Sequence, residues 1–279
     1  MSVKKITTKN TPLISAVIAT YKCERTIEKC LLSIKKQTYP NIDIVVVDSL
    51  YYDKEDQERC KKIIKKYARY FQDGPERCNQ RNRGIKEARG EYILVIDQDM
   101  YLTPKVIEDC YKNINNYVAL IVPEISIGDG YWTKCVAFER YISTYLEEGM
   151  NESCRFFRKS DGLSIGGYDQ GVVGTEDSDF HYRMKTLGKI GKIKNHLYHD
   201  EGRISFFGRV KKKYYYSKAF REYVKRYPTI AAGQFFPFKN SYLKHLDMFV
   251  KNPSLTLGVI LLRSAEITAG IIGIILNRK

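Results

Sequence analysis

Short apolar runs alternate with amphipathic stretches along the first half of the chain. The runs Leu13–Thr20 (LISAVIAT), Ile42–Val47 (IDIVVV) and Tyr92–Ile96 (YILVI) are rich in β-branched residues. Each run is short and nearly continuous in its apolar character, which predicts a buried strand. Buried strands separated by helices predict an α/β fold, with a doubly wound, Rossmann-like, mostly parallel sheet and helices on both faces.

The segments between these runs have the pattern of helices. Ile27, Cys30, Leu31 and Ile34 recur at helical spacing, and a Lys/Glu-rich stretch later places Ile63, Ile64 and Tyr67 on one face. Residues 75–89 form a polar segment closed by Gly90, which predicts a third helix. Beyond residue 100 the pattern weakens, but Ala119–Pro123 is typical of a strand and Ser178–Leu187 of a helix that ends at Gly188.

Polar residues follow the predicted strands directly. They are Thr20 and Tyr21 after the first, Asp48 after the second, and Asp97 with Asp99 after the third. In open α/β sheets, ligands bind beyond the carboxyl ends of the strands. These side chains are therefore the first candidates for a binding site.

Asp97-Gln98-Asp99 places two carboxylates on a chain that leaves a strand. Hard oxygen ligands in this arrangement suit Mg²⁺ or Mn²⁺, which keep open positions for phosphate oxygens. The alternative is an ordinary solvated turn. The position after YILVI favours the metal site.

A glycine pair and an acidic triplet form a second candidate group. Gly166-Gly167 allow close approach of a ligand, and Glu176-Asp177 after Thr175 can accept a proton from a substrate hydroxyl. The alternative is a helix cap, with the acids placed favourably at the helix N-terminus. Asp179 is expected to be a solvated acid.

His199 is a third candidate. A lone histidine is usually structural, but this one follows a short apolar stretch, where a third metal ligand would be useful.

The C-terminal part differs in kind from the rest. Residues 203–226 contain nine Lys or Arg, one acid and seven aromatic residues, and Leu255–Leu276 is apolar apart from Arg263 and Glu266. A bilayer span needs about 20 residues, but a charge at its centre costs about 2.5–3.5 kcal/mol. We therefore expect membrane-associating helices in the interface, with Arg263 and Glu266 paired; the alternative is a buried helix packed on the core.

These patterns predict two domains, a catalytic domain over residues 1–205 and a helical extension over residues 206–279. Within the C-terminal part, Tyr227–Asn240, which contains prolines and Gly233, is the expected boundary segment.

Composition narrows the partners and the compartment. The 279 residues carry a net charge of +15, which favours phosphate-bearing partners such as a nucleotide, an anionic lipid or a nucleic acid. Seven scattered cysteines suggest a reducing compartment, and residues 1–12 lack an apolar signal segment. We expect a cytoplasmic protein, peripheral on the cytoplasmic face of the membrane.

Three ordered segments resemble the inverting nucleotide-sugar glycosyltransferases of family two, which have the GT-A fold. They are SAVIATYKCERTIEKCLLSIKKQTYPNIDIVVVDS, QRNRGIKEARGEYILVIDQDM and SIGGYDQGVVGTEDSDFHYRMKTLG, and the resemblance runs from about Leu13 to Asp200. Lys22, Ala19 and Leu50-Tyr51-Tyr52 depart from the family pattern, which leaves the nucleobase open.

The resemblance implies a role for each matching residue. Asp177 is the general base with Glu176 beside it, Asp99 and His199 bind the metal, and Asp97 touches the ribose or the metal. Thr20, Tyr21, Glu24 and Asp48 line the nucleotide pocket, with Asp48 facing the base. Arg203, Lys211 and Lys212 follow His199 and are expected to contact the diphosphate.

The expected reaction moves a sugar from a UDP- or GDP-linked donor to an acceptor hydroxyl on a lipid-linked or cell-surface glycan, with Mn²⁺ or Mg²⁺ as cofactor. A polyprenyl or dolichyl phosphate is the alternative acceptor. A sugar-1-phosphate nucleotidyltransferase would need a glycine-rich loop where this chain has TYKCERT. A nucleic-acid-binding module would leave the carboxylates unexplained, and an inactive sugar-binding protein stays open.

Overall fold

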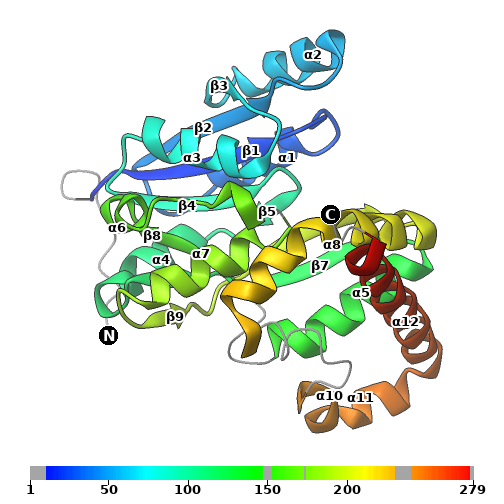
Figure 1. Ribbon diagram of the computed structural model, residues 1–279. Coiled ribbons are helices and arrows are strands. Elements are labelled where there is room, and N and C mark those ends of the chain that lie inside the picture. The colour runs from blue at the N-terminus through cyan, green and yellow to red at the C-terminus, as the bar shows by residue number, and fades with distance from the viewer. Residues whose placement is uncertain (1–10, 147–152, 173, 230–239, 277–279) are drawn as a thin grey trace. The chain divides into compact units, whose positions relative to one another are not determined.

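The computed structural model describes residues 11–146, 153–172, 174–229 and 240–276 (Figure 1). Contacts divide these residues into two compact units. The first unit comprises the described residues of Met1–Pro123, Ser153–Gln170 and Phe180–Tyr198, and the second those of Glu124–Glu152, Gly171–Asp179 and His199–Lys279. The division differs from the boundary expected near residue 205, and the functional assignment of a catalytic domain and an extension stays a prediction.

The first unit is built on a seven-stranded sheet. Its strands, in spatial order, are β3 (Arg69–Asp73), β2 (Ile42–Ser49), β1 (Ile14–Thr20), β4 (Tyr92–Asp97), β8 (Cys154–Arg158), β6 (Ala119–Ile121) and β9 (Ile190–Lys192). β8 runs antiparallel to both of its neighbours, whereas the other neighbouring pairs are parallel. The sheet is therefore mixed but mostly parallel, as predicted.

Helices connect and cover these strands. They are α1 (Ile27–Lys35), α2 (Lys54–Ile64), α3 (Arg77–Glu87), α4 (Val106–Asn113), the short η2 (Ile114–Asn116), and α6 (Lys159–Ser164); the short strand β5 (Met100–Leu102) follows β4. α1 buries Ile27, Cys30, Leu31 and Ile34, the four residues whose spacing predicted it.

The central strands of the sheet are buried on both faces: every residue of β1 and the last six residues of β2 are buried. Val17, Val47 and Val95 pack on one face against Ile85 of α3 and Phe180. Gly84 of α3 lies over this face, where an added Cβ would fall 2.3 Å from Val17 Cγ1. Helix and sheet therefore approach closely, which holds the carboxyl ends of β1, β2 and β4 in fixed register.

The second unit is mostly helical. It contains β7 (Glu124–Asp129), α5 (Tyr131–Arg140), the π-helical turn η3 (Tyr141–Tyr145), α8 (Phe206–Arg226), α10 (Asn240–Lys244), α11 (Leu246–Lys251) and α12 (Pro253–Leu276). The chain passes between the units in η4 (Gln170–Val172), α7 (Glu176–Lys185) and β10 (Leu197–Arg203). Within the second unit, β7 lies beside β10 and α12 packs on α8 and α5.

α12 is long and apolar enough to cross a membrane, judged by length and composition, and 22% of its most apolar window is buried in the protein. Arg263 and Glu266 pair at 2.7 Å, as predicted. Both also bind residues outside α12, since Arg263 contacts Glu139 of α5 and Glu266 accepts from Arg209 of α8 at 2.6 Å. One face of α12 is thus buried, as the alternative interpretation required, while the other is exposed.

The strongest apolar runs gave the correct elements. The runs at Leu13–Thr20, Ile42–Val47 and Tyr92–Ile96 are β1, β2 and β4 to within two residues at each end, and the expected helix at Ser178–Leu187 is α7. Residues 230–239 of the expected boundary segment lie outside the described residues.

Candidate active site

The carboxyl ends of β1, β2 and β4 bring three predicted residues to one edge of the first unit. In the parallel register Thr20 lies opposite Asp48, and Ala19 opposite Asp97. Thr20 Oγ1 donates a hydrogen bond to Asp48 Oδ1 at 2.7 Å. The prediction that these strand ends gather at one place is therefore confirmed for the first unit.

Asp48 is enclosed rather than exposed. Its Oδ2 accepts hydrogen bonds from Tyr52 at 2.6 Å and from Tyr70 at 3.2 Å. Burial raises the pKa of Asp48 above its ordinary value, and the hydrogen bonds from Tyr52, Thr20 and Tyr70 only partly offset this effect. The contact between Asp48 and a nucleobase stays a prediction. It requires Tyr52 and Tyr70 to move away from Asp48 or to contact the base together with it.

Tyr21 forms the exposed surface at this edge, with 52% of its area accessible. Its backbone N–H donates to Gln98 Oε1 at 2.7 Å, and Gln98 Nε2 donates back to the Tyr21 carbonyl at 3.0 Å. The segment after β1 is thereby tied to the turn between Asp97 and Asp99. Glu24 lies further along this segment, half exposed, and accepts from Arg59 Nε at 3.1 Å.

Asp97 is held by buried arginines. Arg81 Nη2 lies 2.7 Å from its Oδ1 and Arg155 Nη2 lies 3.7 Å from its Oδ2. Burial by itself raises the pKa of Asp97, but the charges of Arg81, Arg155 and Arg77 outweigh it and hold this pKa well below its usual range. Asp97 is therefore a permanently charged anchor at the end of β4.

The second unit contains three carboxylates in different environments, those of Glu176, Asp177 and Asp179. Glu176 is buried and accepts from the backbone N–H of Gly174. Asp179 is fully buried and accepts from Tyr227 at 2.9 Å, with Arg226 Nη1 at 3.6 Å, so the expectation of a solvated acid was wrong. Of the three, Asp177 is the residue that is partly accessible to solvent.

Thr175 does not show the bond expected of a helix cap. Its Oγ1 donates to the carbonyl of Val172 at 3.0 Å, and its own carbonyl accepts from the Asp179 N–H at 3.0 Å. These two contacts close the turn before α7.

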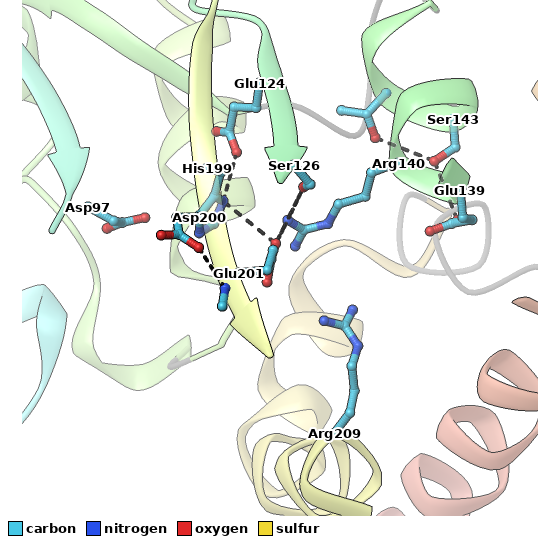
Figure 2. A network of polar contacts seen from close by, with 12 residues as sticks. Asp97, Glu124, Ser126, Glu139, Arg140, Ser143, His199, Asp200, Glu201 and Arg209 are labelled. Atoms are coloured by element: carbon cyan, nitrogen blue, oxygen red, sulfur yellow. Dashed lines mark hydrogen bonds and ion pairs between the residues drawn. The ribbon is translucent and has the colours of Figure 1, made fainter. Parts of the chain in front are cut away.

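His199 lies in a charged network of the second unit (Figure 2). Its Nδ1 is 3.4 Å from Glu124 Oε2 of β7 and 3.8 Å from Glu201 Oε1 on its own strand. Arg140 of α5 binds Glu201, and its Nη1 donates to Ser126 Oγ at 3.1 Å. A histidine that ligates a metal commonly has a carboxylate beside its other ring nitrogen, and Glu124 and Glu201 lie on the Nδ1 side of His199.

The expected diphosphate contacts are exposed cations of the second unit. Arg203 ends β10, and its aliphatic stem covers Gly130, whose φ is +87°. Lys211 and Lys212 are exposed in the first half of α8, and Lys212 Nζ lies 5.9 Å from the ring centroid of Tyr216. The role of these side chains toward a diphosphate stays a prediction.

The predicted site residues thus fall into two sets. Thr20, Tyr21, Glu24, Asp48, Asp97 and Asp99 belong to the first unit; Glu176, Asp177, His199, Arg203, Lys211 and Lys212 belong to the second.

Sequence reasoning missed the residues that fix these groups in place: Gln98, Arg81 and Arg155 in the first unit and Glu124, Arg140 and Glu201 in the second. Glu201 offered a signal, because on a strand it shares a face with His199 two positions earlier.

The donor atoms partly suit a divalent metal. Among the described residues, no group of three or more His, Cys, Asp and Glu side chains could hold an ion. Mg²⁺ and Mn²⁺ can bind to one or two protein side chains, because they take several further ligands from water and from substrate phosphates. Since arginines bind Asp97, Asp99 is the carboxylate of the pair that better fits a metal.

The sequence over residues 15–168 matches the family model described as Glycosyl transferase family 2. Among curated proteins, the chain is 32% identical over 121 residues to the glycosyltransferase GlyA of Streptococcus pneumoniae serotype 4, which covers 42% of this chain and 17% of GlyA. The chain therefore corresponds to a small part of that relative's length.

Solved structures share the fold at low sequence identity. The mannosyltransferase PcManGT from Pyrobaculum calidifontis, in complex with GDP-Man and Mn²⁺, superposes with a TM-score of 0.65 at 13% identity, covering 97% of this chain and 89% of that one. Residues 1–349 of TarS from S. aureus, in complex with UDP-GlcNAc, give a TM-score of 0.54 at 14% identity, covering 95% and 91%.

Proposed function

The chain belongs to glycosyl transferase family 2 and has the GT-A fold, and from this premise we propose that it is an inverting, metal-dependent transferase that uses a nucleotide-diphosphate sugar as donor. The observation that carries the proposal is the carboxylate turn Asp97-Gln98-Asp99, fixed at the end of β4 by Arg81 and by the reciprocal bonds between Gln98 and Tyr21. The GDP-Man, UDP-GlcNAc and Mn²⁺ complexes of the structural neighbours support this donor class and metal.

The donor is proposed to lie against the carboxyl edge of the first unit. Thr20, Tyr21, Glu24 and Asp48 line the nucleotide pocket, and charged Asp97 accepts hydrogen bonds from the ribose. Arg203, Lys211 and Lys212 are the proposed contacts of the diphosphate oxygens. Mn²⁺ or Mg²⁺ held by Asp99, with His199 as a further ligand, would stabilise the negative charge of the departing nucleoside diphosphate.

Asp177 is proposed to be the general base. It accepts the proton of the acceptor hydroxyl while that oxygen attacks the sugar carbon from the face opposite the leaving group, which inverts the anomeric centre. Glu176, buried beside it and bonded to the Gly174 N–H, keeps the turn in shape. The proposed acceptor is a hydroxyl on a lipid-linked or cell-surface glycan.

A polyprenyl or dolichyl phosphate is the second candidate acceptor. The second pKa of a phosphate monoester is about 6, so its oxygen is already a nucleophile at neutral pH and needs no base. The exposed apolar face of α12 favours an acceptor held in a membrane.

Substitution of Asp177 tests both versions. With a panel of UDP- and GDP-sugars and Mn²⁺, Asp177→Asn should lower the rate of transfer to a glycan hydroxyl by about 10²–10⁴-fold, whereas Lys185→Gln, an exposed change on the same helix, should leave it unchanged. Full activity of Asp177→Asn on a lipid phosphate would assign the second acceptor. Wild-type protein that transfers no sugar, or that works equally well with a chelator, contradicts the proposal.

We also propose that the protein binds the cytoplasmic face of a membrane through its C-terminal helices. α12 buries Val259, Leu262 and Ala269, while Leu257, Ile260 and Ile271 on its other face are at least half exposed. Such a face suits a helix lying in the interface. Flotation with lipid vesicles tests this attachment.

A further inference from the structure

Two buried cysteines of the first unit meet beside the predicted nucleotide pocket. Cys23, in the segment after β1, and Cys60, in α2, are both fully buried. The backbone N–H of Cys23 donates to Cys60 Sγ at 3.2 Å. The N–Cα bond is about 1.46 Å long, so Cys60 Sγ lies within about 4.7 Å of Cys23 Cα, which is within reach of a disulfide.

The contacts around Cys60 favour its thiolate. Its sulfur accepts a hydrogen bond from the backbone N–H of Cys23 at 3.2 Å, and the Cys23 thiol is a near neighbour. Interaction with the Cys23 thiol is the largest effect, and it holds the pKa of Cys60 below the ordinary thiol value although burial opposes it. Cys60 is therefore the nucleophile of the pair, and Cys23 keeps its proton.

The segment that carries Cys23 is the place where a small reagent can enter. Tyr21 and Lys22, directly before it, are exposed. Lys22 is the one non-glycine residue with positive φ in the described part of the chain, at +49°, a conformation that costs free energy for a side chain with a Cβ. Local opening of this segment breaks the two hydrogen bonds between Tyr21 and Gln98, releases the positive φ of Lys22 and exposes Cys23.

We propose that Cys23 and Cys60 form a reversible disulfide, a modification site that links the segment of Tyr21 and Glu24 to α2. The Cys60 thiolate attacks a small-molecule disulfide, forms a mixed disulfide and releases one thiolate. The Cys23 thiol then loses its proton and attacks Cys60 Sγ, releasing the second thiolate. The two protein thiols are oxidised and the small disulfide is reduced to two thiols.

The test is thiol counting after treatment with oxidised glutathione. The reduced protein has seven cysteines, so seven thiols should react with a chromogenic reagent in denaturant before treatment and five after it. Peptide mass spectrometry without reductant should identify Cys23 linked to Cys60. Cys110→Ser, a change in buried α4, should keep the disulfide, whereas Cys23→Ser and Cys60→Ser should each lose it.

Thermal unfolding gives a second readout that needs no variant. Because the two residues are 37 positions apart, the disulfide should raise the Tm of the oxidised wild type by about 10 °C, and a reductant should reverse the rise. Seven reactive thiols after prolonged oxidation, or a linkage between other cysteines, overturns the proposal. Neither readout requires glycosyl transfer, so this inference and the proposed function can fail separately.

Discussion

Arg81 shows how much a single buried charge contributes to the proposed site. Its side chain is 0% exposed on α3 and lies 2.7 Å from Asp97, whose side chain is 17% exposed, so water can replace little of either partner. Removing one member of such a pair leaves the other buried and poorly compensated. We predict that Arg81→Met lowers the free energy of unfolding by about 3 kcal/mol in urea denaturation, the lower end of the range because Arg155 remains.

Arg83 provides the control for this prediction on the same helix. It pairs with Glu87 at 2.8 Å, but its side chain is 46% exposed. Exposed pairs at this spacing contribute little, so Arg83→Met should cost less than about 1 kcal/mol. If both variants lower the free energy of unfolding equally, then burial does not determine how much the Arg81–Asp97 pair contributes to stability.

At the residue level, the sequence was enough to find the polar residues at the ends of strands, but not the arginines that pair with them. Asp48, Asp97 and Thr20 were found because each follows an apolar run. Arg81 and Arg155 were not, because an arginine in a polar helix or a short strand has no pattern that distinguishes a buried ion pair from a solvated charge. Asp179 was misjudged for the same reason, since its partners Tyr227 and Arg226 lie far along the chain.

At the element level, two glycines of α12 differ in what surrounds them. A Cβ at Gly270 would meet no atom within 4 Å, whereas a Cβ at Gly273 would fall 1.9 Å from Ser217 Oγ of α8. We predict that Gly270→Ala raises the free energy of unfolding by up to about 1 kcal/mol through helix propensity. Gly273→Ala should lower it by about 1–3 kcal/mol, because it forces α12 from α8.

Urea denaturation of both variants and of the double variant Gly273→Ala/Ser217→Ala checks this prediction. Removal of the Ser217 hydroxyl should recover part of the loss, because the closest clash is with Oγ. If Gly273→Ala is as stable as Gly270→Ala, then α12 does not pack on α8 as the structure shows.

Helices and strands could be predicted where the segment is a nearly continuous run of apolar residues. β1, β2, β4 and α12 have such patterns, and their bounds were close to those expected. β3 (RYFQD) and β10 (LYHDEGR) contain several polar residues, so neither strand could be predicted from an apolar run. Their strand conformation comes from pairing with β2 and with β7, which is a property of the assembled sheets and not of the segments.

At the scale of the whole molecule, charge is concentrated at one end of the chain. Residues 206–279 contain 14 Lys or Arg and three Asp or Glu, a net of +11 out of the +15 of the whole sequence. In the same segment, Arg263 and Glu266 are satisfied within the second unit, by Glu139 and Arg209. These two charges of α12 therefore have partners inside the unit, and the exposed Leu and Ile side chains of the helix favour contact with lipid.

Vesicle binding should accordingly depend on both charge and apolar area. We predict that the protein floats with vesicles containing about 30% anionic lipid at low salt, and that about 0.5 M salt weakens but does not abolish binding, since each Lys or Arg near the surface contributes about 1 kcal/mol and is screened within a Debye length. The triple variant Ile260→Ser/Ile271→Ser/Ile275→Ser should lose the salt-resistant part of the binding, because its changes remove apolar side chains that are at least half exposed. Ser264→Ala/Thr268→Ala, on the same face, should bind as the wild type does. Undiminished salt-resistant binding of the triple variant would show that α12 does not enter the interface, and a protein that stays unbound at low salt would exclude membrane attachment altogether.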